Sequence, residues 1–135
     1  MRHKVKRIKL SRDLDHKRAL LRNLVAALFT HKAIVTTEAK ARAARSLAER
    51  LIHIAKRGDL AARREVLARL PQPDVVRHLF DVIVPKVRER EGGYTQILHY
   101  GIRKSDGARL VLWKLTDFEK EVATKPEEKS AKQGA

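Results

Sequence analysis

Cysteine is absent from this chain, and aromatic residues are scarce. With zero cysteines in 135 residues, the chain can form neither disulfides nor thiolate metal sites. Aromatic residues make up 4% of the sequence. They are Phe29, Phe80, Tyr94, Tyr100, Trp113 and Phe118. Because a protein that reads single-stranded nucleic acid by stacking needs several exposed rings, this scarcity argues against base-by-base readout.

Long apolar runs are missing as well. No run in the sequence approaches the roughly 18 to 20 apolar residues that span a bilayer. The N-terminus lacks the apolar region of a secretory signal. We therefore expect a protein that stays in the cytoplasm and has no membrane partner.

Signatures of catalysis and cofactor binding are also absent. The histidines do not fall into a recognised metal-ligand spacing, and Gly92-Gly93 matches neither a Walker loop nor a dinucleotide fingerprint. The paired acids at positions 13 and 15, and at 89 and 91, neighbour Arg or Lys. Helix capping or solvated ion pairs explain such acids better than acid–base catalysis. We expect no enzymatic activity, catalytic residue, metal site, cofactor or small-molecule substrate.

Positive charge is what the sequence has in excess, with a net charge of +15. The charge is graded: residues 1–32 carry ten Lys or Arg against two Asp, whereas residues 117–135 carry four Lys against five acids. Six cations without a carboxylate lie in the first twelve residues, namely Arg2, Lys4, Lys6, Arg7, Lys9 and Arg12. These charges repel one another unless a polyanion condenses on them, so we expect this arm to contact nucleic-acid phosphates.

Hydrophobic periodicity predicts about four helices. Apolar residues recur at three-to-four spacing over residues 13–31, 38–57, 60–70 and 75–84. The expected N-terminal caps are Asp13 (or Ser11 or Asp15), Thr37, Asp59 and Asp74. The expected stops are Gly58, Pro71-Gln72-Pro73 and Pro85.

The other segments are rich in β-forming residues or in polar ones. Residues 33–36 predict a short strand, and residues 94–103 and 109–116 predict a hairpin around the turn-forming residues 104–108. Because a lone hairpin is marginal in water, we expect it to pair with the strand near residue 34. The prediction is an α+β fold with a small three-stranded mixed sheet. The expected organisation is a basic extension (1–12), one globular domain (13–117) and a disordered tail (118–135).

Several motifs, in order, resemble one known family. They are Met1-Arg2-His3-Lys4, the stretch from His16 to Leu24, His31 with Ile34-Val35-Thr36-Thr37 and Lys40-Ala41, and Gly92-Gly93-Tyr94-Thr95. This series is similar to the L17 family of bacterial large-subunit ribosomal proteins, from residue 1 to about 116. The resemblance implies helices against a small mixed sheet and no enzymatic activity. It further implies a structural role in the large subunit near the exit of the nascent-peptide tunnel, with large-subunit rRNA and neighbouring ribosomal proteins as partners.

The same resemblance suggests which residues contact rRNA. The arm and the first helix would lie among phosphates through Arg2, His3, Lys4, Lys6, Arg7, Lys9, Arg12, His16, Arg18, Arg22 and Asn23. The next strand and helix would bind a phosphate through Thr36, Thr37 and Lys40. Gly92 and Gly93 would let the backbone approach RNA closely. Tyr94 would either stack on a base or sugar, or cap the core at a strand start.

Other interpretations stay open at this point. Arginines on the later helices serve either solubility or RNA contact; they are Arg50, Arg57, Arg63, Arg64 and Arg69. A DNA-binding or nucleoid-architectural protein would share the charge, and residues 60–84 form a loose helix-turn-helix candidate with an atypical Pro-Gln-Pro joint. An RNA-modifying enzyme is a third class, but the sequence contains no cofactor or catalytic motif that would indicate it.

Overall fold

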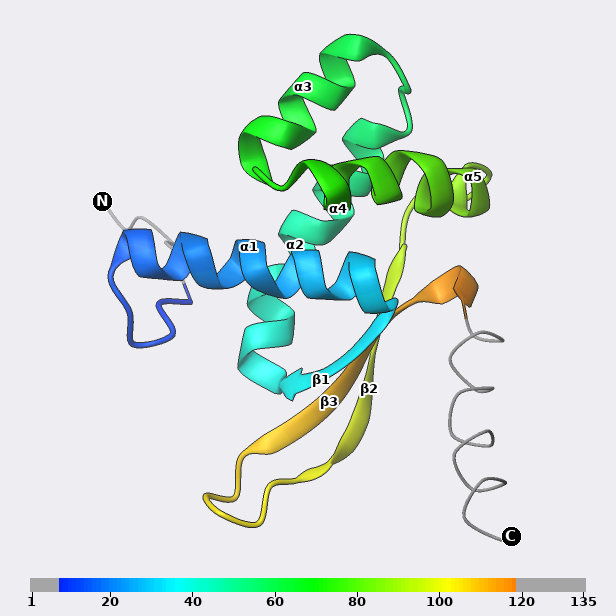
Figure 1. Cartoon of the computed structure of the whole chain (residues 1–135). Helices are drawn as coiled ribbons and strands as arrows, with labels where there is room; N and C mark the ends of the chain where they lie inside the picture. The colour runs from blue at the N-terminus through cyan, green and yellow to red at the C-terminus, as the bar shows by residue number, and fades with distance from the viewer. Residues whose placement is uncertain (1–7, 119–135) are drawn as a thin grey trace, which may run out of the picture.

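The helices and strands of the protein form an α+β fold in the computed structural model, which describes residues 8–118 (Figure 1). The chain runs α1 (Leu14–His31), β1 (Ala33–Thr37), α2 (Glu38–Ala55), α3 (Leu60–Arg69), α4 (Pro73–His78), a π-helical turn (Leu79–Ile83), α5 (Val84–Val87), β2 (Thr95–Ile102), β3 (Arg109–Leu115) and a 3-10 turn (Thr116–Phe118). This order confirms the expected fold class, and the expected helices and strands are all present.

Most helix ends follow the local sequence signals. The Asp13 side chain caps α1 by accepting a hydrogen bond from the backbone N–H of His16 at 3.2 Å. Asp59 caps α3 in the same way, accepting from the N–H of Ala62 at 2.7 Å. Gly58 has a φ of +73°, the left-handed conformation that allows the chain to leave α2. Thr37 is the N-cap of α2, but its side chain makes no capping hydrogen bond, so that part of the prediction is wrong. The backbone of Thr37 is extended like those of the capping residues Asp13 and Asp59, so the difference lies in the side chain and not in the backbone. Thr37 is also the last paired residue of β1, opposite Leu110.

The fourth predicted helix starts earlier and ends later than expected. Its N-cap is Gln72 rather than Asp74, because Pro73 occupies the first helical position, where its missing N–H costs nothing. The helical path then continues through Pro85 to Val87. A proline normally clashes with the carbonyl four residues earlier. Here the wider π turn precedes it, and the N–H of Val84 bonds to the carbonyl of Leu79, five residues back. The π turn therefore accommodates the proline that was expected to end the helix.

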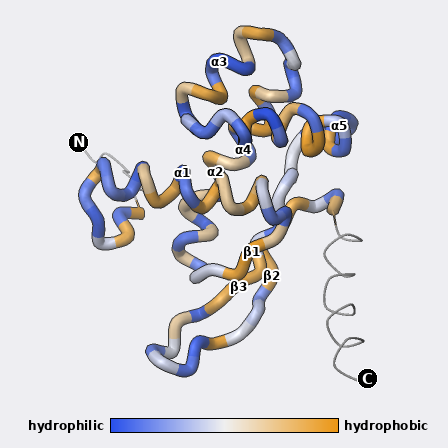
Figure 2. Tube along the Cα trace, in the orientation of Figure 1, coloured by the Kyte–Doolittle hydropathy of each residue, from blue (hydrophilic) through white to orange (hydrophobic). Residues whose placement is uncertain are grey.

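The sheet has the strand order β1-β3-β2. β3 is antiparallel to both neighbours, so the expected mixed sheet is in fact antiparallel throughout. β3 follows β2 through the loop of residues 103–108 and therefore runs opposite to it, and β1 lies along the other edge of β3 in the same direction as β2. A register shift between His99 and Gly101 leaves Tyr100 as the extra residue of a bulge. The hairpin projects beyond the helices in Figure 1, and its turn is hydrophilic in Figure 2.

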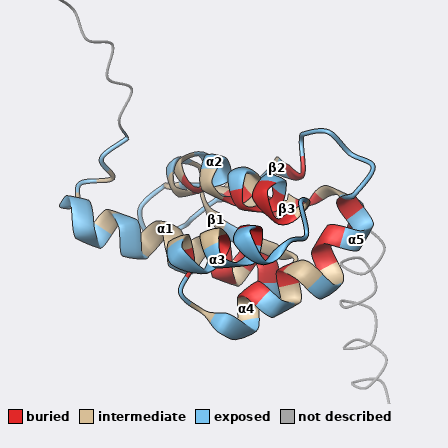
Figure 3. Ribbon diagram, turned by 90° about the horizontal axis from the view of Figure 1, so that it is seen from above, coloured by how far each residue is buried: buried red, intermediate tan, exposed pale blue. Residues whose placement is uncertain are grey.

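The core lies between the helices and one face of the sheet. Its largest fully buried side chains include Trp113 on β3, Phe29 on α1 and Leu51 on α2. Figure 3 marks the buried parts of the helices and strands in red. Phe118 is also buried, so the packed part of the chain includes this residue beyond the expected boundary at 117. The predicted tail otherwise lies outside the described residues. Within residues 8–118, no helix is long and apolar enough to cross a bilayer.

Candidate nucleic-acid interface

The described end of the basic arm lies beside the first turn of α2. Arg2, His3, Lys4, Lys6 and Arg7 fall outside the described residues. Ile8 lines a shallow groove with four other residues, namely Glu38, Ala39, Arg42 and Arg109. The next turn of the arm is tight, since Leu10 and Ser11 have φ values of +56° and +54°. The Arg12 guanidinium donates to the Leu10 carbonyl at 2.7 Å, and Lys9 is exposed. The arm therefore enters α1 from the side where α2 begins.

The N-terminal half of α1 extends past the core. Every residue from Leu14 to Leu24 is exposed or half-buried, and burial begins at Val25 (Figure 3). Among the predicted contact residues on this half, His16, Arg18 and Asn23 are exposed and Arg22 is half-buried. Neither Arg18 nor Arg22 makes an ion pair or side-chain hydrogen bond with another residue in 8–118. This half-helix continues the cationic surface of the arm.

Several arginines elsewhere in the described chain pair with acids. On α2, Glu38 pairs with Arg42 at 2.6 Å. Glu65 on α3 contacts both Arg57 at 2.7 Å and Arg69 at 3.5 Å. The remaining pairs are Arg45–Glu49, Arg90–Asp117 and Arg103–Asp106. Charge compensation is therefore uneven: these six arginines have acidic partners, whereas Arg18 and Arg22 on α1 have none within residues 8–118.

The hairpin turn holds one exposed ion pair with a perturbed carboxyl. Arg103 donates to both oxygens of Asp106, at 2.9 Å and 2.6 Å. The N–H of Ala108 also donates to Asp106, at 3.2 Å. The hydrogen bond from Arg103, followed by that from Ala108, lowers the pKa of Asp106 from 3.8 to about 2. The pKa of Arg103 is correspondingly raised. This pair fixes the turn at Gly107, which has a φ of +69°.

The predicted contact residues at the start of α2 are separated from the glycine pair. Thr36, Thr37 and Lys40 are half-buried around the first turn. Tyr94, in contrast, contacts Lys56, the C-cap of α2. A helix of 18 residues is about 27 Å long at 1.5 Å per residue. The predicted residues thus lie at opposite ends of α2 and do not form a single patch.

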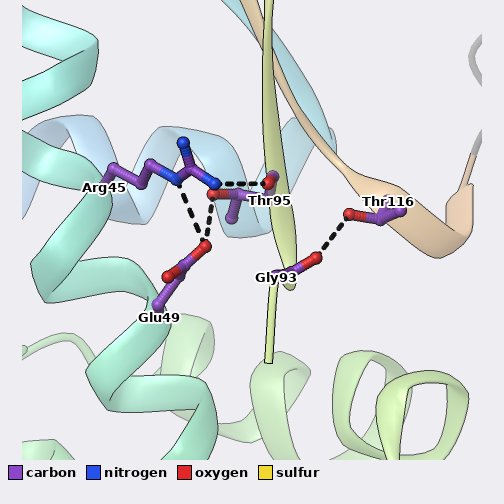
Figure 4. Close-up of polar contacts among 5 residues, drawn as sticks. All are labelled: Arg45, Glu49, Gly93, Thr95 and Thr116. Atoms are coloured by element: carbon purple, nitrogen blue, oxygen red, sulfur yellow. Dashed lines mark hydrogen bonds and ion pairs between the residues drawn. The ribbon is translucent and has the colours of Figure 1, made fainter. Parts of the chain in front are cut away.

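The Gly-Gly-Tyr-Thr motif anchors β2 to α2 and to the end of β3. Figure 4 shows the contacts of Gly93 and Thr95. The hydroxyl of Thr116 donates to the Gly93 carbonyl at 3.0 Å. Thr95 is buried, and its hydroxyl lies 3.3 Å from the carboxylate of Glu49. Arg45 bridges the two by pairing with Glu49 at 3.3 Å and reaching the Thr95 carbonyl at 3.5 Å. The motif therefore has a structural explanation.

Tyr94 is only 2% exposed, so its ring cannot stack on a base. Its hydroxyl accepts from Lys56 Nζ at 3.1 Å and donates to the Glu91 carbonyl at 3.2 Å. Lys56 also lies 5.2 Å from the ring centroid and donates to the Arg90 carbonyl. The stacking interpretation is a wrong prediction, and the alternative of a core-capping aromatic is what the structure shows.

Two features of this region escaped the sequence-based prediction. Tyr100 is 61% exposed on the β2 bulge, whereas the other aromatic side chains in residues 8–118 are buried or half-buried. The only sequence signal for the exposure of Tyr100 was the alternation of inward-facing and outward-facing residues along β2. A bulge shifts that alternation. Arg45, Glu49 and Lys56 were missed as supports of the glycine loop. The i,i+4 spacing of Arg45 and Glu49 signals their pairing, but nothing local signals their partner Thr95.

The chain was compared with known protein families and curated proteins. The family model described as "Ribosomal protein L17" matches residues 20–116. The chain belongs to the ribosomal protein L17 family. Two Clostridium proteins named "Large ribosomal subunit protein bL17", from Clostridium perfringens (strain SM101 / Type A) and Clostridium kluyveri (strain NBRC 12016), are each 51% identical over 107 residues, covering 79% of this chain and 95% of the relative. The protein of that name from Thermoanaerobacter sp. (strain X514) is 50% identical, covering 79% of this chain and 96% of its own.

Family membership confirms the resemblance inferred from the motifs. As an L17 protein, the chain is a large-subunit ribosomal protein, and the family consists of structural constituents of the ribosome. Within residues 8–118, no group of three His, Asp or Glu side chains is placed to hold a metal ion. The match gives no support to the DNA-binding or RNA-modifying alternatives.

Proposed function

We propose that this L17 protein binds and stabilises folded large-subunit rRNA, near the nascent-peptide tunnel exit. The supporting observation is the uncompensated cationic surface on α1, where Arg18 and Arg22 have no acidic partner among the described residues. Cations held in this way attract phosphates and release condensed counterions. The arm adds six more cations just before this helix.

Each predicted region has a distinct role in this proposal. The arm residues Arg2, His3, Lys4, Lys6, Arg7, Lys9 and Arg12 lie among crowded phosphates. His16, Arg18, Arg22 and Asn23 continue this contact along α1. Thr36, Thr37 and Lys40 bind a phosphate at the start of α2, where the Thr37 hydroxyl is not used for capping. Gly92 and Gly93 are exposed and allow close approach of the backbone.

Stacking is assigned to Tyr100 instead of Tyr94. Tyr100 is the only exposed aromatic residue within residues 8–118, and it lies at the bulge of β2. An aromatic face accepts any base, which suits a protein that recognises RNA by shape.

Deleting residues 2–12 tests the arm. The deletion removes six cations but keeps the Asp13 cap, so we expect a folded body that binds large-subunit rRNA more weakly. At 0.7 to 0.9 counterions per phosphate contact, the slope of log affinity against log salt should fall by about 4 to 5. Filter binding of a full-length large-subunit rRNA transcript over a salt series measures this slope.

The control is thermal unfolding of the truncated protein, which should retain a cooperative transition. A truncated protein that folds, binds rRNA as tightly as the full chain and keeps the same salt slope would contradict the role of the arm.

The place near the tunnel exit rests on the family resemblance and needs its own test. Ribosomes carrying this protein, stalled with nascent chains that hold a photoreactive residue at increasing distance from the peptidyl-transferase centre, should cross-link to it once that residue reaches the exit. Cross-links to other large-subunit proteins alone, at every chain length, would place it elsewhere. The cross-linked neighbours would also identify its protein partners.

A further inference from the structure

Three helices bring four arginines to one groove. Arg18 and Arg22 come from α1, Arg50 from α2 and Arg69 from α3. The groove has a volume of about 390 Å³, within the range of about 300–1,000 Å³ usual for ligand pockets. No carboxylate is among the residues that line it. The groove is therefore a concave surface of a single charge sign.

These guanidinium groups have few partners within the folded protein. Arg18, Arg22 and Arg50 form no ion pair or side-chain hydrogen bond within residues 8–118. Arg69 lies 3.5 Å from Glu65, but that carboxylate is also engaged by Arg57, at 2.7 Å. Like charges at i and i+4, such as Arg18 and Arg22, destabilise a helix. An anion between the helices would remove this repulsion.

The floor of the groove is apolar or small. Leu21 and Leu47 contribute half-buried aliphatic surface, and Ala43, Ser46 and Ala68 keep the groove open because their side chains are short. A free phosphate needs only charge, whereas a sugar–phosphate backbone also presents the carbon face of the ribose. Guanidinium groups around an apolar floor suit both parts of this backbone.

We propose that this groove, between α1, α2 and α3, seats a segment of the large-subunit rRNA backbone and is the main RNA site of the folded body. The inference rests on the proposed rRNA binding and extends it to Arg50 and Arg69, two of the arginines whose role the sequence left open. It does not extend to Arg57, which makes the shorter contact with Glu65 at 2.7 Å, or to Arg63, whose guanidinium lies 4.8 Å from the centroid of the Phe80 ring. Neither of these lines the groove.

The first test removes charge from the groove. The double variant Arg22→Gln with Arg50→Gln should lower the salt slope for the rRNA transcript by about 2, one for each lost phosphate contact. The matched control is Arg64→Gln with Arg88→Gln, which loses the same charge from exposed positions outside the groove. We expect the control to keep the native slope. Thermal unfolding confirms that both variants fold.

The second test fills the groove without changing charge. Ala68→Leu places a larger side chain in the lining of the groove, and we expect it to weaken rRNA binding. Ala61→Leu makes the same substitution at another exposed position of α3, outside the groove, and should bind as the native chain does. A photoreactive benzoylphenylalanine at Ser46 should cross-link to rRNA in assembled subunits.

The outcomes separate this site from the broader function. If both groove variants bind like their controls while deletion of residues 2–12 weakens binding, the groove proposal fails and rRNA binding by the protein stands. If the arm deletion also binds as the full chain does, the proposed function fails as well. A cross-link from Ser46 to a neighbouring protein instead of rRNA would equally overturn the groove as an RNA site.

Discussion

Gly93 adopts a conformation that other residues avoid. Its φ is +64°, and a Cβ added there would meet no atom within 4 Å. The cost of a side chain therefore comes from the backbone alone. We expect Gly93→Ala to lower the free energy of unfolding by about 1 to 2 kcal/mol. Gly92→Ala is the control, because Gly92 lies outside the left-handed region and is equally open. Urea unfolding measures both, and equal effects would contradict the assignment.

Asp106 should titrate at unusually low pH. Its pKa is lowered to about 2 from 3.8, so the carboxylate stabilises the turn above about pH 4, where the unfolded chain is also ionised. That stabilisation is lost as the pH falls from about 4 through about 2. NMR titration of the Asp106 carboxyl and of the Ala108 amide should show this midpoint. In Arg103→Gln the midpoint should rise toward the ordinary value, and an unchanged midpoint would rule out Arg103 as the cause of the low pKa.

At the scale of an element, the ends of α3 and α4 have different physical origins. The Asp59 side chain caps α3 directly, whereas Asp74 lies in the first turn of α4 behind Gln72 and Pro73. We expect Asp59→Ala to cost about 1 kcal/mol of unfolding free energy and Asp74→Ala only a few tenths, from the helix dipole. Chemical denaturation of the two variants measures the difference. A larger loss from Asp74→Ala would restore that residue as the cap.

The two halves of α1 lie in different surroundings. Its C-terminal half supplies Val25, Leu28 and Phe29 to the core, while its N-terminal half carries Arg18 and Arg22 into the groove. In the proposed complex with rRNA, the folded helix would hold these cations in place before contact. Cations on a folded helix cost less backbone entropy to place on RNA than cations on a flexible segment do.

At the scale of the whole molecule, the net charge of +15 affects stability and binding in opposite directions. Salt screens repulsion among the cations of the free protein, since the Debye length shrinks from about 10 Å at 0.1 M to about 3 Å at 1 M. We therefore expect added NaCl to raise the melting temperature of the free protein while weakening its binding to rRNA. Calorimetry of Arg18→Gln with Arg22→Gln should show a smaller salt-dependent rise. A melting temperature that falls with salt would contradict this charge argument.

Much of the fold was predictable because its signals are local. The periodicity of α1 to α3, the caps Asp13 and Asp59, and the stop at Gly58 each depend on residues within a few positions of one another. The exceptions involve features that these local patterns do not show. Pro85 did not end its helix, because a π turn accommodates it. Thr37 is the N-cap residue of α2 as expected, but its side chain makes no capping hydrogen bond.

The candidate site was less predictable, because it depends on contacts between distant segments. Tyr94 stands in a motif that suggested RNA contact, yet packing against Lys56 buries it. Thr95 lies 46 residues from Glu49 in sequence, and no local pattern joins them. The glycine motif could be recognised from the sequence, but its structural role could not.

The sequence by itself determined the helices, the hairpin, the charged arm and the family, because periodicity, turn chemistry and charge are properties of neighbouring residues. Only the tertiary structure decided which charges remain unpaired, which ring is exposed and which arginines meet. Arg22, Arg50 and Arg69 lie on three different helices, and they line one groove only once those helices have packed. Packing also pairs Arg57 with Glu65, although the sequence alone does not distinguish Arg57 from the arginines that line the groove.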